Sequence, residues 1–225
     1  MAGRRYTLEH PTTILARANQ ALAALERYKL RLDEVASTLS ALEIEDLVTV
    51  RDATVVSQRL EMVSRIADEI SGYGAELGTD GRLLSLQLEE LMAGVHTDRE
   101  LIAQDYLPSG RKNRTLEQAL EDLAQLSAAE LLDLSNVAKA LGYPAGPEIL
   151  EATVSPRGYR LLSRVPRLPN LVLTRIVEHF GSLQKVLAAT VDELQDVEGV
   201  GDARARSIRE ALSRLADASI IERYT

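Results

Sequence analysis

The chain has 225 residues, of which 45% are hydrophobic and 27% are charged, and this balance excludes a largely disordered protein. Aromatic residues make up only 4% and cysteine is absent, which argues against a β-rich fold and excludes disulfides, cysteine-ligated zinc and a thiol nucleophile. The net charge is −8, and the sequence has neither a signal peptide nor an apolar run of membrane-spanning length, so we predict a cytoplasmic, all-α protein.

Residues 1–12 are too few to form a domain. The alternation between Arg4 and Leu8 is typical of a strand, but no partner strand follows in the sequence, and a lone strand is not stable. We interpret these residues either as a disordered leader or as the residual strand and exit of a domain that this chain does not contain.

Residues 13–146 are predicted to form a helical bundle or spine. Thr12 or Thr13 can cap its first helix. Apolar residues then recur at alternating spacings of four and three, the heptad pattern of packed helices. This apolar seam consists of Ile14, Ala18, Ala21, Leu25, Tyr28, Leu32, Val35, Leu39 and Leu42. Such a seam also fits a surface for oligomerisation or for another protein. The carboxylates of this region, Glu43 among them, are expected at the surface.

Further helices are predicted in chain order over residues 49–77, 83–92, 98–106, 116–126 and 128–141. Ser127 and Glu130 have the spacing of a capping box at the start of the last of these. Residues 142–147 are rich in glycine and proline, and we expect them to form a hinge. The second domain is therefore predicted to comprise residues 147–225.

Residues 194–212 have the pattern of a helix-hairpin-helix motif, two short helices joined by a Gly-Val-Gly turn. Gly199 and Gly201 allow positive φ and let another surface approach the backbone, and Val200 is expected to insert into the core. The first N–H groups of the helix after Gly201 have no intrahelical partner, and together with the helix dipole they favour an anion. The basic residues that follow and can reach phosphates are Arg204, Arg206 and Arg209.

The same frame recurs thirty-two residues earlier in a degenerate form. The apolar positions are Leu162, Val165, Leu168, Leu173, Ile176 and Phe180 in the first copy and Leu194, Val197, Val200, Ala205, Ile208 and Leu212 in the second. Arg167 replaces the first glycine, and Pro169 replaces the second and removes one N–H donor. We expect Arg167, helped by Arg164, to substitute a charged side chain for the missing amide contact. Residues 155–156, Ser-Pro, are expected to begin the first helix of this copy.

Charge is distributed unevenly along the chain. Residues 155–225 hold eleven basic and nine acidic residues, a net charge of +2, whereas residues 1–154 carry −10. A polyanion is therefore expected to bind the C-terminal region, and contacts of this kind read phosphates rather than bases. The alternative is that the hairpins serve only for packing or bind protein. The predicted DNA-binding residues are Gly199, Val200, Gly201, Arg204, Arg206, Arg209, Arg164 and Arg167, and no catalytic or metal-binding residue is predicted.

Four segments outside the hairpins resemble one known family. They are YTLEHPTTILARANQAL from Tyr6, LEIEDLVTVRD from Leu42, ELGTDGRL from Glu76 and LLDLSNVAKALGYP from Leu131. Together with the tandem hairpins, they resemble the DisA family of bacterial DNA integrity scanning proteins over essentially the whole chain.

The resemblance implies a protein of three parts. An N-terminal diadenylate cyclase domain joins two ATP molecules into cyclic di-AMP with a divalent metal, a helical linker follows, and a helix-hairpin-helix domain binds DNA, branched DNA in particular. The Asp-Gly-Ala and Arg-His-Arg motifs of the cyclase are absent, because Asp80-Gly81 is followed by Arg82 and no histidine is flanked by arginine. The chain is therefore expected to be the linker and DNA-binding half, without enzymatic activity or cofactor. The resemblance also implies an octamer formed through the cyclase domain, and a cyclase regulated by DNA.

Overall fold

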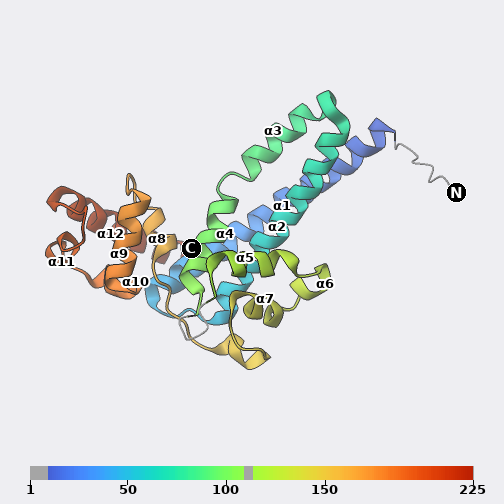
Figure 1. The fold of residues 1–225 in the computed structure, drawn as a ribbon. Coiled ribbons are helices and arrows are strands. Elements are labelled where there is room, and N and C mark those ends of the chain that lie inside the picture. Colours follow the sequence, from blue (N-terminus) through green and yellow to red (C-terminus); the bar gives the residue numbers. More distant parts are fainter. Residues whose placement is uncertain (1–9, 109–113, 225) are drawn as a thin grey trace. The chain divides into compact units, whose positions relative to one another are not determined.

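The computed structural model describes residues 10–108 and 114–224, and every regular element within these ranges is a helix, as predicted. The first helices are α1 (Pro11–Glu45), α2 (Val50–Leu77), η1 (Gly78–Gly81), α3 (Arg82–Leu91) and α4 (Val95–Tyr106). They are followed by α5 (Leu116–Gln125), α6 (Ala128–Leu131), α7 (Leu134–Leu141) and η2 (Pro147–Glu151). The last five are α8 (Tyr159–Ser163), α9 (Asn170–Phe180), α10 (Leu183–Ala188), α11 (Val191–Gln195) and α12 (Asp202–Tyr224) (Figure 1).

One compact unit consists of residues 1–31 and 62–96. Its buried side chains come from the first half of α1, from the second half of α2, from Leu84 of α3 and from Val95 at the start of α4. The backbones of α2 and η1 approach closely, since a Cβ at Gly81 would lie 2.5 Å from the Gly74 carbonyl oxygen. All members of the predicted apolar seam of α1, in both units, are buried or half-buried. The packing prediction for this helix is therefore confirmed, and the seam is not an open surface.

The other unit consists of residues 32–61 and 97–225. This division differs from the predicted domain boundary between residues 146 and 147, which stays a prediction. Within this unit, Val50, Ala138 and Leu150 form a small core, and Thr49 pairs with Thr153 in an isolated β-bridge. These contacts fix α7 and η2 against the start of α2.

The start of α1 differs from the prediction. Residues 1–9 lie outside the described part of the chain, but Pro11 and Thr12 are already helical and not part of a strand. Proline favours the first helical position because its missing N–H would have no partner there. The backbone N–H of Thr13 donates to the His10 carbonyl at 2.8 Å, which closes the first turn.

The single helix predicted over residues 128–141 is also wrong, because the structure has two helices, α6 and α7. Ser127 and Glu130 form the predicted capping box at the start of α6. The Asp133 carboxylate then accepts a hydrogen bond from the Ser135 N–H at 2.9 Å and begins α7 as its N-cap. A new cap only a few residues after the first interrupts the helix.

The C-terminal helices α8 to α12 gather around one hydrophobic core, drawn in orange and red in Figure 1. All twelve apolar positions of the two predicted repeats lie in this core or pack against it. Val200 is buried as expected, and Leu168 occupies the equivalent half-buried position. The repeated frame therefore packs as a pair of equivalent units.

Helix α8 is capped from a distance. The Asp105 carboxylate, at the end of α4, accepts hydrogen bonds from the backbone N–H groups that begin α8. The donors are Gly158, Tyr159 and Arg160, at 2.7, 2.7 and 2.9 Å. The prediction that residues 155–156 begin this helix is wrong, because α8 begins at Tyr159. The reason is that its cap comes from α4 and not from the preceding chain.

The capping is reciprocal. The Arg157 guanidinium, just before α8, donates to the carbonyls of Gln104 and Leu107 at the end of α4, at 3.1 and 2.8 Å. Cations stabilise helix C-termini, and anions stabilise N-termini, because helix-end groups lack intrahelical partners. Helices α4 and α8 thus satisfy each other's ends.

A buried polar cluster lies beside these caps. Glu43 of α1 is only 1% exposed, although its sequence context suggested a surface carboxylate. The Tyr106 hydroxyl and the Arg160 guanidinium both donate to its Oε1 atom, at 2.7 and 2.5 Å. Although burial lowers the pKa of Arg160, the Glu43 charge and other nearby groups raise it overall, so the guanidinium stays charged. The ion pair explains how a carboxylate is accommodated in this core.

Candidate nucleic-acid interface

The two hairpins have matching backbone geometry. In the second hairpin, a turn joins α11 and α12, and its Gly199 has a φ of +91°. In the first hairpin, a turn joins α8 and α9, and its Arg167 has a φ of +59°. Positive φ is strained for a residue with a side chain, so Arg167 holds the shape of the missing glycine at an energetic cost. The degenerate copy has therefore kept the hairpin conformation.

The prediction of a positive φ is wrong for the second glycine of the motif. Gly201 is not among the residues with positive φ, and its position precedes the first residue of α12. A Cβ at Gly201 would meet no atom within 4 Å. Nothing within the described chain therefore requires glycine there, and the open space lies beside the N–H groups that begin α12.

The three arginines predicted on α12 differ in their environments. The Arg204 guanidinium donates to the Gly199 carbonyl oxygen within the hairpin. Arg206 pairs with Asp202, one turn earlier, at 3.0 Å. Arg209 donates to the Leu187 carbonyl at 2.6 Å and thereby links α12 to the end of α10. Arg204 and Arg206 are exposed, whereas Arg209 is half-buried and holds the helices together.

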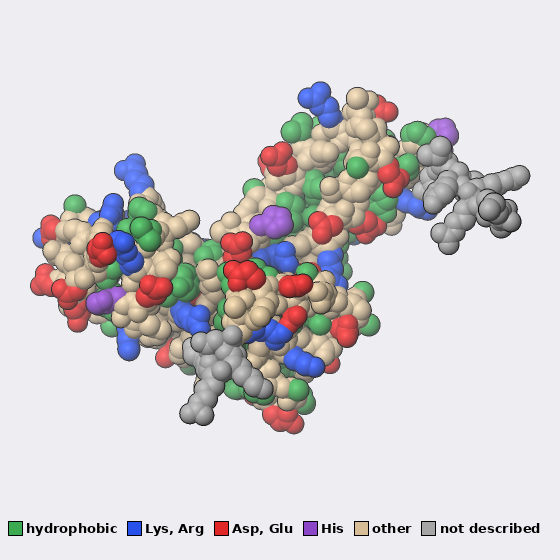
Figure 2. Space-filling model, in the orientation of Figure 1, with side chains coloured by type: hydrophobic (Ala, Val, Ile, Leu, Met, Phe, Trp, Pro, Cys, Tyr) green, Lys and Arg blue, Asp and Glu red, His purple; other side chains and the backbone are tan. Residues whose placement is uncertain are grey.

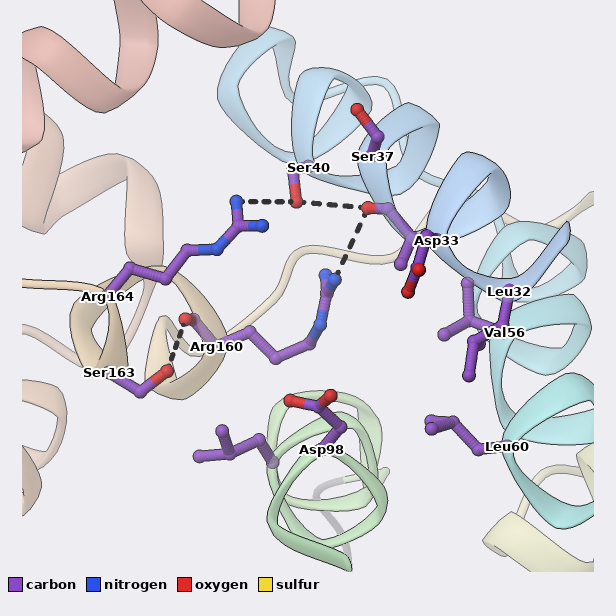
Figure 3. A pocket seen from close by; sticks show the side chains of 12 residues that line it. Leu32, Asp33, Ser37, Ser40, Val56, Leu60, Asp98, Arg160, Ser163 and Arg164 are labelled. Atoms are coloured by element: carbon purple, nitrogen blue, oxygen red, sulfur yellow. Dashed lines mark hydrogen bonds between the residues drawn. The ribbon is translucent and has the colours of Figure 1, made fainter. Parts of the chain in front are cut away.

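Arg164 does not assist Arg167 as the sequence suggested. Its guanidinium lines a cavity of about 300 Å³ between α1, α2, α4 and α8, where it donates to the Ser40 hydroxyl at 3.4 Å (Figure 3). Asp33 and Asp98 line the same cavity. Arg167 lines a different cavity, at the first hairpin. Arg164 is the C-cap residue that follows α8, and no sequence pattern indicates the direction of its side chain.

A groove at the first hairpin brings three arginines together. It has a volume of about 440 Å³, and Arg167 lines one side while Arg204 and Arg214 of α12 line the other. Ser207 also contributes to this wall. We call this cavity the first-hairpin groove. Sequence reasoning missed Ser207 and Arg214, although they lie about one and three turns beyond Arg204 on α12, a spacing that was a usable signal.

Electrostatics around the hairpins are mixed. Asp202 places a carboxylate in the first turn of α12, beside the N–H groups that would otherwise attract an anion. On the face that Figure 2 shows, basic and acidic side chains are interspersed. Among the described residues, no group of three histidine or acidic side chains could hold a metal ion, and no helix is long and apolar enough to cross a membrane.

Comparisons with known proteins assign two regions of the chain. Residues 8–150 match the model of the "DisA bacterial checkpoint controller linker region", and residues 160–214 match the "SAM-like helix-hairpin-helix tandem". Proteins named DNA integrity scanning protein DisA are similar along the whole chain. The one from Frankia alni is 66% identical over 224 residues, which is 100% of this chain and 62% of the relative. Those from Streptomyces coelicolor and Acidothermus cellulolyticus are 66% and 67% identical over 99% of this chain and 60% and 61% of the relatives. The chain thus spans about three fifths of the length of the relatives it matches.

Proposed function

Because the chain belongs to the DisA family through its linker region, we propose that it is a non-catalytic DNA-binding module that holds DNA phosphates on its tandem hairpins. The observation that carries the proposal is Gly201, a glycine that no contact within the described chain requires. Open space beside unpaired helix N–H groups is the arrangement that a backbone-bound phosphate needs. The relatives are named for scanning DNA, which agrees with this proposal.

Each predicted residue has a role in this proposal. Val200 anchors the turn in the core, and Gly199 gives the turn its shape. Gly201 lets a phosphate reach the N–H groups of α12, while Arg204 and Arg206 supply charge at its rim. Arg167 supplies charge at the first hairpin. Arg209 supports α12 through the Leu187 carbonyl, and Arg164 supports α8, so neither is proposed to contact DNA directly.

We also propose two properties of the longer proteins in which this region occurs. Branched DNA is preferred over linear duplex, because two hairpins can hold two strands whose separation differs from that in a uniform helix. DNA held by the hairpins regulates the synthesis of cyclic di-AMP from ATP by a cyclase domain outside this chain. Cyclase activity of the full-length protein that is the same with and without junction DNA would contradict the second property.

Fluorescence anisotropy with a labelled four-way junction and a labelled linear duplex, at two salt concentrations, tests DNA binding. We expect tighter binding to the junction and a steep loss of affinity with salt. Replacing both Arg204 and Arg206 with alanine should weaken binding by about tenfold. With fewer phosphate contacts, fewer counterions are released from the DNA on binding, and less free energy is gained. The matched control replaces Arg27 and Arg31, two exposed arginines of α1. Equal binding by the two double variants would contradict the proposed site.

Asp202 provides a prediction of the opposite sign. Asp202→Asn removes a carboxylate beside the N–H groups of α12 and frees Arg206 from its ion pair. We therefore expect DNA affinity to increase by about threefold at low salt, with a smaller gain at high salt because the charge is exposed. Anisotropy titrations measure both. Asp192→Asn, an exposed acidic residue in the first turn of α11, is the control and should change affinity less.

A further inference from the structure

The two hairpins are related by pseudo-symmetry, and the turn of each hairpin faces the second helix of the other hairpin. The turn of the second hairpin lies against α9, since a Cβ at Gly199 would be 3.3 Å from a Val172 methyl carbon and 3.6 Å from the Arg175 guanidinium. The turn of the first hairpin lies against α12 across the first-hairpin groove. At an offset of thirty-two residues, Val172 corresponds to Arg204, and Arg175 corresponds to Ser207.

The two equivalent places differ in how they are filled. At the second hairpin the Arg175 guanidinium donates to the Glu198 carbonyl at 3.4 Å and pairs with its carboxylate at 3.5 Å. Val172 fills the space beside it, so a side chain at position 199 would be crowded as well as strained by the positive φ. At the first hairpin Ser207 is too short to reach the turn, and the groove stays open. This difference also explains why position 167 tolerates an arginine side chain.

The open groove has the chemistry of a phosphate site. Arg167, Arg204 and Arg214 line it together with the Ser207 hydroxyl, and no carboxylate belongs to its lining. Its floor is apolar, formed by Leu168 and Ile208. Arg214 pairs with Glu210 at 3.8 Å, which is a weak exposed ion pair. The Arg204 guanidinium also donates to the Gly199 carbonyl but has further N–H donors. Arginine side chains around a concave, partly apolar surface can bind a phosphate with its sugar.

We infer that the first-hairpin groove binds one DNA phosphate, with Arg214 and Ser207 as further contact residues. The inference rests on the proposed DNA binding and assigns different modes to the two hairpins. The second hairpin holds a phosphate through the backbone N–H groups of α12. The first hairpin holds one between arginine side chains in its groove. The equivalent place at the second hairpin is closed by Arg175.

Two variants test the groove by different means. Arg214→Ala removes one guanidinium, whereas Ser207→Leu fills the groove without changing charge; both residues are exposed, so folding should be retained, which circular dichroism and thermal melting verify. Lys185→Ala is the matched control, because it removes one exposed charge of the same domain outside the groove. Anisotropy titrations over a salt series use a dumbbell duplex without strand ends and the same duplex with 5′-phosphorylated ends.

We expect Arg214→Ala to weaken binding about fivefold and to reduce the slope of log affinity against log salt by about one. Ser207→Leu should weaken binding by a similar factor, although no charge is lost. If the variants lose affinity equally for both duplexes, the groove binds a phosphate inside the strand. If they lose affinity only for the duplex with open ends, the groove binds a terminal phosphate. If both variants bind like Lys185→Ala while the Arg204/Arg206 double variant is impaired, the groove inference is overturned and the proposed function stands. If the unmodified chain does not bind DNA, both fail.

Discussion

Replacing Asp105 with alanine is expected to lower the free energy of unfolding by about 3 kcal/mol, since three backbone N–H groups that begin α8 lose their acceptor in a buried place. The first hairpin begins with this helix, so the loss should concentrate there. Urea denaturation measures the total effect, and hydrogen exchange at Gly158, Tyr159 and Arg160 measures the local one. Glu100→Ala, an exposed carboxylate of the same helix α4, is the control and should change little.

The same carboxylate makes stability depend on pH. Burial, with the Glu43 charge nearby, raises the pKa of Asp105 from 3.8 to about 7, against the opposing effect of the backbone N–H groups and Arg160. A carboxyl group whose pKa is raised by folding binds its proton more tightly in the folded state. Its contribution to stability is therefore complete below about pH 4 and is lost as the pH rises to about 7.

Asp105→Asn removes this titration while it keeps an oxygen for part of the cap. The difference in unfolding free energy between the native chain and this variant should therefore decrease by a few kcal/mol from pH 4 to pH 7, at about 1.4 kcal/mol per pKa unit, and stay constant above. Denaturation curves at several pH values test this. A difference that does not change between pH 4 and pH 7 would show that Asp105 is already ionised throughout.

The sequence was sufficient to predict the fold class and most helix positions. Heptad spacing placed the buried face of α1, and the alignment of two apolar frames placed twelve positions in the core of the C-terminal helices, although not those of α10. These predictions succeeded because they depend on periodicity, which is local. Two of the failures involve contacts between distant residues, whereas the division of the helix over residues 128–141 results from a local cap at Asp133. Asp105 caps α8 from a helix more than fifty positions earlier, and Glu43 is buried because Arg160 reaches it.

The site was predictable to a similar extent. The Gly-Val-Gly turn and its degenerate copy were recognisable, and each turn has a residue with positive φ at the equivalent position. The sequence could not indicate that Arg164 turns toward Ser40 or that Arg206 pairs with Asp202, because side-chain direction depends on neighbours in space. Nor could it distinguish the open groove at Ser207 from the closed one at Arg175, a difference that needs both helices in place.

The two glycines of the second hairpin should respond in opposite ways to alanine. Gly199 has a φ of +91° and lies against Val172, so Gly199→Ala is expected to lower the free energy of unfolding by about 2 kcal/mol. Gly201 has neither constraint, because its Cβ would enter open space. Gly201→Ala should therefore leave stability within about 0.5 kcal/mol, since the loss of a helix cap is offset by a less flexible unfolded chain.

Gly201→Ala should weaken DNA binding although it leaves stability nearly unchanged. A methyl group in the open space would keep a phosphate away from the N–H groups of α12, so we expect about tenfold weaker binding to a four-way junction by a variant that is as stable as the original. Denaturation and anisotropy on the same preparations separate the two effects. Gly94→Ala is the control, because Gly94 has positive φ outside the hairpins, and its substitution should affect stability without affecting affinity at conditions where the chain is folded. Normal DNA binding by Gly201→Ala would remove the observation on which the proposed function chiefly rests, because the glycine would then be explained neither by packing within the chain nor by a partner.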